Sequence, residues 1–438
     1  MRIALLSYRS KEHCGGQGVY VRYLSQGLVD LGHDVEVFSG QPYPENLDPR
    51  VKLIEVPSLD LFGGPKPGHL PKVSQLRDRY DALEYLTALT GCFAEPLAFS
   101  MRANRLLRER RADFDVVHDN QCLGYGLLGL LRRGVPLAAT IHHPISRDRR
   151  LELDAASGAR RLSVARWYGF VRMQARVARR LPLIIGVSDI AAADTVTDFR
   201  LRSEQMRVVP LGVDTDVFVP GAERIPGRLV AVASADRPLK GITHLLDAVA
   251  KLRIDHEVSL DLVSALEPGG ATDRQLDALG LRDCVTVHTG VSDSALASLL
   301  GSAQIMCVPS LYEGFSLPTV EALSCGTPVV ASRTGAIPEV VGPDGECARL
   351  VEPGNVEALV GQIGRLLTDP GERERLSIAG RHRALARFSW TSVAQATVAV
   401  YQDAITRTGS TGTGSTGTRS GRTRPGRTIR KGAARADR

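Results

Sequence analysis

The segment from Ser310 to Gly342 constrains the fold of this chain more than any other part of the sequence. It reads SLYEGFSLPTVEALSCGTPVVASRTGAIPEVVG, and the apolar runs IMCVPS, from Ile305, and PVVAS, from Pro328, predict buried strands on either side of it. Between the strands, Pro318 is typical of a helix start. Strand, helix and strand form a βαβ unit, whose strands are parallel. Its polar residues gather where the first strand ends, which is the ligand-binding edge of such sheets.

The same alternation of short strands with helices runs through the chain twice. It predicts an α/β fold of two Rossmann-like, doubly wound parallel-sheet domains that face a central cleft. We expect an N-terminal domain over residues 1–213, a C-terminal domain over 214–390, and a helix over 391–406 that crosses back to the first domain. Residues 41–74 are rich in Pro and Gly, lack periodicity, and are expected to leave the sheet.

Two glutamates stand eight positions apart around the start of the predicted helix, Glu313 in the loop and Glu321 about one turn inside. Carboxylates accept hydrogen bonds from vicinal hydroxyls, and the backbone N–H groups at a helix start favour a phosphate. A ligand that is anionic in the middle and hydroxylated at both ends, such as a nucleoside-diphosphate sugar, fits this arrangement. The alternative is a capped helix with surface glutamates. The residues expected around the phosphate are Ser316, Leu317, Thr319 and Val320.

A glycine-containing loop joins the first strand to the first helix. Gly15 and Gly16 would let a ligand approach the backbone beside a helix N-terminus, where an anion is favoured; a tight turn without a ligand is the alternative. The loop lacks the GxGxxG fingerprint, and no acidic residue ends the second strand at Phe38-Ser39. A nicotinamide dinucleotide is therefore not expected.

Two adjacent histidines end the predicted strand over residues 136–144. Neighbouring strand residues point to opposite faces, so only one of them can face the crevice. We favour His142 over His143 for contact with a sugar hydroxyl or a developing charge; the alternative is that both cap the strand end.

The basic charge of the chain belongs to its C-terminal tail. The net charge is +7, but residues 407–438 hold nine basic residues and one acidic residue, which leaves −1 for the rest. This Gly/Ser/Thr-rich tail is predicted to be a disordered, solubilising extension, and no specific nucleic acid is expected as a partner. The alternative is an arm that touches anionic lipid or nucleic acid. Seven scattered cysteines without a CxxC pair, and the short apolar run at the N-terminus, favour a reducing, cytoplasmic location. The sequence has no run of 18 apolar residues that could span a membrane.

A second basic segment, residues 157–180, is predicted to form one long helix with seven arginines. Its apolar positions favour a surface helix packed on the domain. The alternative is a basic amphipathic helix that touches an anionic membrane, which would place the protein at the inner face of the membrane.

The segments EGFSLPTVE, ALSCGTPVVAS and GAIPEVV closely resemble the E-x7-E signature region of family-4 glycosyltransferases, which are retaining enzymes of the GT-B fold. The resemblance covers nearly the whole folded body. The segments RIALLSY, GGQGVYVRYLSQGLVDLGHDVEVF, ATIHH, VSD, VVPLGVDTDVF and PLKG all have counterparts in the same order.

The resemblance implies roles for individual residues. The first glutamate of the motif, Glu313, would contact the donor sugar, and the second, Glu321, would contact the ribose. Lys240 would bind the pyrophosphate, and His142 would line the sugar site. Lys240, Glu313 and His142 are thus the expected catalytic residues.

One position departs from the family pattern. Family members often carry an arginine five or six residues before the lysine, where this chain has Ala235 or Ser234. Arg237 could reach the same diphosphate from another direction. The glycine loop matches the family at Gly15 and Gly16, which would approach the donor phosphate and the acceptor.

Together these features predict a retaining hexosyltransferase that uses a UDP- or GDP-sugar as co-substrate and needs neither a metal nor another cofactor. The acceptor would be a lipid or a small molecule. The alternatives are a non-hydrolysing nucleotide-sugar epimerase and a catalytically inactive protein that binds nucleotide sugars.

Overall fold

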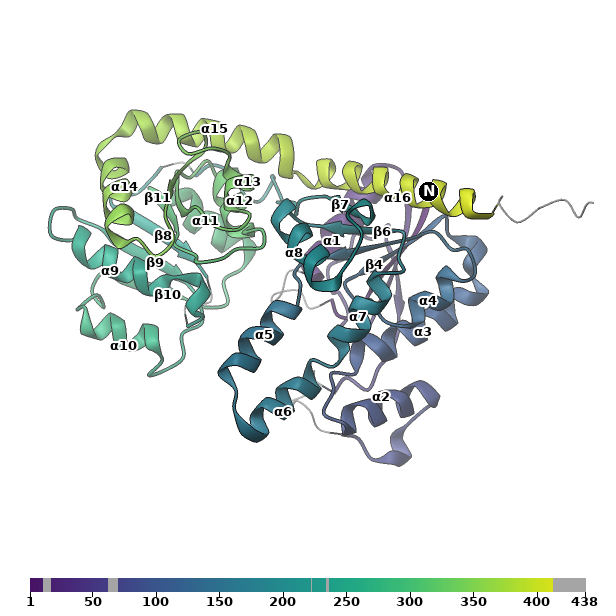
Figure 1. Ribbon diagram of the computed structural model, residues 1–438. Coiled ribbons are helices and arrows are strands. Elements are labelled where there is room, and N and C mark those ends of the chain that lie inside the picture. Colours follow the sequence, from purple (N-terminus) through teal and green to yellow (C-terminus); the bar gives the residue numbers. More distant parts are fainter. Residues whose placement is uncertain (11–16, 62–69, 222, 234–235, 413–438) are drawn as a thin grey trace, which may run out of the picture.

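The protein consists of two parallel β-sheets, each covered by helices (Figure 1). The computed structural model describes residues 1–10, 17–61, 70–221, 223–233 and 236–412. The first domain is built on strands β1 Arg2–Ser7, β2 Asp34–Ser39, β3 Lys52–Glu55, β4 Val116–Asn120, β5 Leu137–Ile141, β6 Leu183–Gly186 and β7 Met206–Val208. The second domain is built on β8 Arg228–Val232, β9 Ser259–Val263, β10 Val285–His288, β11 Ile305–Val308, β12 Val329–Ser332 and β13 Ala348–Val351.

Both sheets have the strand order of a doubly wound fold. The first has the order β3-β2-β1-β4-β5-β6-β7 and the second the order β10-β9-β8-β11-β12-β13. The chain reverses direction across each sheet between β1 and β4 and between β8 and β11. Such a switch point opens a crevice at the carboxyl ends of the strands, and ligands bind there. The expected fold of two doubly wound domains is confirmed.

Helices cover both faces of the sheets. Strands β4 and β5 are buried along their whole length, as central strands of a parallel sheet must be. The helices of the first domain are α1 Gln17–Asp30, α2 Arg79–Leu89, α3 Glu95–Glu109, α4 Gly126–Leu131, α5 Ser146–Ala155, α6 Gly158–Trp167, α7 Phe170–Ala178 and α8 Asp189–Phe199. Those that follow are α9 Ile242–Leu252, α10 Ala271–Ala278, α11 Asp293–Ser302, α12 Leu317–Ser324, α13 Ile337–Val341, α14 Val356–Thr368, α15 Pro370–Phe388 and α16 Trp390–Gly412.

The last helix returns to the first domain, as expected. Helix α16 (yellow in Figure 1) leaves the second domain and packs on α1. The chain therefore crosses between domains twice, and the crossings touch: the N–H of Val213 donates to the carbonyl of Phe388 at 2.7 Å. A Cβ on Gly212 would lie 2.4 Å from the ring of Trp390, so only glycine fits beside it. Helix α16 runs to Gly412, beyond the expected end at residue 406; the remaining tail lies outside the described residues.

Two expectations from the sequence were wrong. Residues 41–74 do contain a strand, β3, which pairs with β2 at the sheet edge. The segment 157–180 is two helices instead of one, because the carbonyl of Trp167 bonds to the N–H of Phe93 and the chain turns at Tyr168 and Gly169. Helix α7 packs on the domain, whereas α6 buries none of its residues. Among the described residues, no helix has the length and apolar character required to cross a bilayer.

Candidate active site

The loop from Pro309 to Ser316 places Glu313 at the switch point of the second sheet, directly after β11. Ser316 has a φ of 74°, a left-handed conformation that turns the chain sharply into α12. Pro318 then lies in the first turn of α12, where its missing N–H costs nothing. Glu321 lies inside the helix, as the sequence predicted. Both glutamates are largely buried, with 9% of each residue exposed.

Lys240 reaches Glu313 across the switch point. It follows β8 in the short 3-10 helix Pro238–Lys240, and its Nζ lies 2.8 Å from Oε1 of Glu313. The hydroxyl of Ser310 donates to the same oxygen at 2.8 Å. Because the side chain of Lys240 is 31% exposed and that of Glu313 only 11%, the ammonium group lies on the solvent side of the pair. A cation and a carboxylate therefore meet at the edge where a parallel sheet binds its ligands.

Glu321 is a buried carboxyl group for which no hydrogen-bond or ion-pair partner is found among the described residues. Burial raises its pKa to about 8, and the negative charge of Asp293 acts in the same direction. A carboxyl group with this pKa is mostly protonated at neutral pH, so it can both donate and accept a hydrogen bond.

The N–H groups at the start of α12 are less available than expected. Those of Thr319 and Val320 donate to the carbonyl of Ser316 at 3.1 and 3.4 Å, because the first turn closes immediately. Both N–H groups therefore have a partner in the free protein, and the phosphate contacts expected of Ser316, Thr319 and Val320 stay predictions. The hydroxyl groups of Ser316 and Thr319 are 2.7 Å apart. A phosphate contact by Leu317 stays a prediction.

On the first domain, His142 lies at the carboxyl edge of the sheet, directly after β5. Its Nε2 is 2.7 Å from Oδ1 of Asn120, whose amide nitrogen donates to the carbonyl of Gln17. Nε2 therefore donates to Asn120. Burial lowers the pKa of His142 to about 4, so the ring is neutral, and no donor to the lone pair of Nδ1 is found in the part of the chain that the structure describes. His143 turns away and lies 3.2 Å from Asp148.

A buried network behind His142 was not anticipated from the sequence. His118, on β4, lies 2.6 Å from the hydroxyl of Tyr401 on α16 and 2.7 Å from that of Thr140 on β5. The hydroxyl of Tyr20 lies 3.1 Å from Thr140, and its ring meets that of His142 edge to face at 4.6 Å. His118 and Thr140 lie on strands that are buried along their whole length, and Tyr20 and Tyr401 lie on helices, so no sequence pattern pairs them.

The remaining predicted residues are Arg237, Gly15 and Gly16. Arg237 is exposed. Burial raises the pKa of Tyr168, and the positive charge of Arg237 opposes that rise, so Arg237 lies near this residue of the first domain. Its contact with a diphosphate stays a prediction. Gly15 and Gly16 lie outside the described residues. The edge of the first sheet and the edge of the second sheet lie close together. The hydroxyl of Ser188, in the first domain, donates to the carbonyl of Gly314, in the second, at 2.7 Å.

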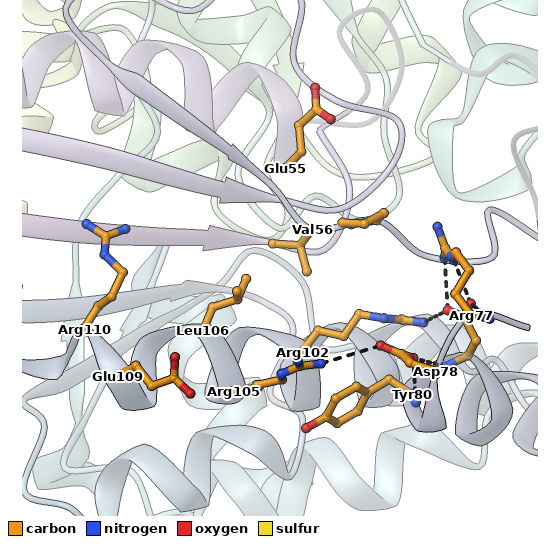
Figure 2. A pocket seen from close by; sticks show the side chains of 12 residues that line it. Glu55, Val56, Arg77, Asp78, Tyr80, Arg102, Arg105, Leu106, Glu109 and Arg110 are labelled. Atoms are coloured by element: carbon orange, nitrogen blue, oxygen red, sulfur yellow. Dashed lines mark hydrogen bonds and ion pairs between the residues drawn. The ribbon is translucent and has the colours of Figure 1, made fainter.

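A separate cavity of about 480 Å³ lies in the first domain, and it contains none of the predicted site residues. In Figure 2, Arg102 and its neighbours on α3 line one side, and Glu55 and Val56 line the other. The charge of Arg102 is already neutralised, because its guanidinium bonds to Asp81 at 2.6 Å and Glu84 at 2.7 Å.

Two family models match this chain, one for each domain. Residues 15–212 match the "Glycosyl transferase 4-like domain", and residues 222–383 match "Glycosyl transferases group 1". Over 407 residues the chain is 60% identical to the MMP alpha-(1->4)-mannosyltransferase of Mycolicibacterium hassiacum, covering 93% of this chain and 99% of that one. It is 31% identical to the D-inositol 3-phosphate glycosyltransferase of Xylanimonas cellulosilytica, covering 93% and 97%.

Solved structures agree on the fold. The sucrose-phosphate synthase of Thermosynechococcus elongatus superposes with a TM-score of 0.68 at 23% identity, over 93% of this chain and 99% of that one. Anabaena HepE, solved in complex with UDP, gives 0.66 at 18% identity, over 92% and 100%. This chain belongs to the group 1 glycosyltransferases and has the GT-B fold; it is a glycosyltransferase.

Proposed function

We propose that this protein is a retaining mannosyltransferase, which moves mannose from a UDP or GDP donor to a saccharide acceptor and forms an α(1→4) bond. We infer the position of the donor site from the 2.8 Å contact between Lys240 and Glu313 at the switch point of the second sheet. The choice of mannose, of the linkage and of MMP as the acceptor to test rests on the 60% identity to the Mycolicibacterium hassiacum enzyme.

In this proposal the second domain holds the nucleotide sugar through three side chains. Glu313 accepts hydrogen bonds from the hydroxyl groups of the sugar, Lys240 contacts the diphosphate, and Glu321 contacts the ribose. A ligand that displaces Lys240 from Glu313 gains a cation for its own negative charge. Glu321, which is protonated at neutral pH in the free protein, can donate to one ribose hydroxyl and accept from the other.

The transfer step then needs stabilisation of the leaving group more than a protein nucleophile. The bond from the anomeric carbon to the diphosphate oxygen breaks, and the acceptor oxygen bonds to that carbon from the same face. The acceptor proton passes to the leaving phosphate. Lys240 stabilises the negative charge that develops on the diphosphate, and this contribution requires no metal ion. The lone pair on Nδ1 of His142 accepts a hydrogen bond from a sugar hydroxyl.

A donor and acceptor screen tests this function. The protein is incubated with GDP-mannose, UDP-mannose, GDP-glucose or UDP-glucose, with and without MMP. We expect a mannosylated product from one mannose donor, with α(1→4) geometry by NMR, and negligible donor cleavage without acceptor. Inversion at C2 of an otherwise intact donor, without acceptor, would favour the non-hydrolysing epimerase. Binding of donor with no turnover under any condition would favour an inactive binding protein.

Membrane contact stays a prediction. Helix α6 exposes Leu162 and Trp167, which are 54% and 38% exposed, beside three arginines of the same helix. An exposed basic helix of this kind can lie on an anionic bilayer. Sedimentation with vesicles that contain anionic lipid, compared with neutral vesicles, tests it.

A further inference from the structure

The two residues that flank Glu313 both hydrogen-bond to the first domain. Tyr312 donates its hydroxyl to Oδ2 of Asp194, on α8, at 2.7 Å. On the other side, the carbonyl of Gly314 accepts from Ser188, the N-cap residue of α8, at 2.7 Å. The guanidinium of Arg147 lies 3.4 Å from the centroid of the Tyr312 ring, which adds a cation–π contact. The backbone of Glu313 is thus held on both sides by a helix of the other domain.

A third contact ties α8 to the same region. The carboxylate of Glu339, on α13, accepts from the N–H groups of Asp189 and Ile190 at 2.7 and 3.0 Å. It satisfies two unpaired donors at the helix start, where a negative charge is favoured. The turn before α13 is joined to Glu313 itself, because the N–H of Ala336 donates to its carbonyl at 3.0 Å. The loop that holds Glu313 and the turn before α13 are therefore joined. Helix α8 contacts them through Tyr312, Gly314 and Glu339.

These contacts lie apart from the covalent crossings between the domains. The crossings meet where Val213 bonds to Phe388 and where the ring of Trp390 packs on Gly212. Loop and element-terminal residues such as these can serve as a hinge when two domains move. A rotation of the domains about these crossings would separate Tyr312, Gly314 and Glu339 from α8, and so would release both neighbours of Glu313.

We propose that Ser188, Asp194, Tyr312 and Glu339 are positioning residues that form an interdomain clasp, which holds Glu313 in the geometry for sugar transfer when the domains are closed. This inference rests on the proposed function of the donor site. Lys240 and Glu321 belong to the second domain and have no part in the clasp. Breaking it therefore lowers the rate of transfer and leaves the affinity for a free nucleoside diphosphate unchanged.

The test uses the full-length chain with Tyr312→Phe, Asp194→Ala and the double variant. Tyr312→Phe keeps the ring under Arg147 and removes only the hydroxyl. We expect each single change to lower kcat about tenfold, the effect of one lost hydrogen bond. The double variant should be no slower than the slower single variant, since both changes remove the same contact. The dissociation constants of UDP and GDP should stay within twofold of the wild-type values (roughly the additivity error of such cycles).

Asp198→Ala is the matched control, because Asp198 lies on the same helix but pairs with Arg150 inside the first domain. It should not change kcat. An unchanged kcat in Tyr312→Phe, or additive losses in the double variant, would overturn the clasp. So would an equal loss of nucleotide affinity, which indicates local disorder of the loop.

A measurement without turnover separates this inference from the proposed function. Small-angle X-ray scattering gives the radius of gyration of the wild type, Tyr312→Phe, Glu339→Gln and Asp198→Ala. We expect an increase for the two clasp variants and none for the control, whether or not the protein transfers mannose. Identical radii in all four proteins would overturn the clasp. Absence of transfer by the wild type, with clasp variants that open, would overturn the proposed function alone.

Discussion

The ammonium group of Lys240 lies 2.8 Å from a carboxylate oxygen of Glu313, which joins the loop after β8 to the loop after β11. These two strands are neighbours in the sheet but lie on opposite sides of its topological switch point. The pair therefore occupies the crevice where a doubly wound sheet binds ligands. It connects the cation assigned to the leaving group with the carboxylate assigned to the sugar.

Replacing Lys240 with alanine should slow transfer about 100- to 1,000-fold, as expected for the loss of a group that stabilises developing charge. The change also removes the partner of Glu313, so thermal unfolding should be measured beside the kinetics. Lys251→Ala, which removes an exposed ion pair with Glu357 in the same domain, is the control. Equal activity in the two variants would remove Lys240 from the mechanism.

Glu321 should make the stability of the protein depend on pH. Its pKa is raised to about 8 from the 4.5 of an ordinary glutamate, so between these values the folded state binds more protons than the unfolded state. Its contribution to stability is therefore present below pH 4.5 and is lost as the pH rises through 8. Glu321→Gln should remove that loss, and its Tm should exceed that of the wild type by more at pH 9 than at pH 6. A constant Tm difference would contradict the raised pKa.

His142 should act as a neutral hydrogen-bonding group. Because its pKa is lowered to about 4, the ring carries no charge at pH 6 or at pH 8. His142→Ala should lower kcat about 10- to 100-fold, the effect of a hydrogen bond lost from a buried site. The ratio of wild-type to variant kcat should be the same at both pH values. A ratio that falls steeply between pH 6 and pH 8 would show that the protonated ring takes part.

Transfer should not depend on a divalent cation. In the proposed mechanism Lys240 balances the charge of the diphosphate, so a chelator at millimolar concentration should leave kcat unchanged. Loss of activity that Mg²⁺ or Mn²⁺ restores would contradict this account.

The sequence predicted those parts of the protein that depend on local pattern. Two doubly wound sheets, and the positions of Glu313 and Glu321, follow from apolar runs and from a proline at a helix start. The pairing of the N–H groups of Thr319 and Val320 was not predicted, although the bond from Val320 to the carbonyl of Ser316 is the ordinary first i→i−4 bond of a helix that begins at Leu317.

Contacts between distant segments could not be predicted. The Tyr401–His118–Thr140 network joins residues far apart in the chain. The contacts of α8 with Tyr312 and Glu339 depend on how the two domains pack. The periodicity of apolar residues in the sequence carries no information about that packing. Strand β3 was missed because it is a short edge strand within a segment rich in Pro and Gly.

In the proposed donor site, Glu313 binds the sugar and Glu321 binds the nucleotide of one ligand. Isothermal titration calorimetry separates the two roles when the wild type, Glu313→Ala and Glu321→Ala are each titrated with the preferred mannose donor and with the matching free nucleoside diphosphate. We predict that Glu321→Ala weakens both ligands by similar factors, whereas Glu313→Ala weakens the nucleotide sugar and leaves the free diphosphate unchanged. Equal weakening of both ligands by Glu313→Ala, or no effect of either change, would show that the two glutamates do not divide the donor in this way.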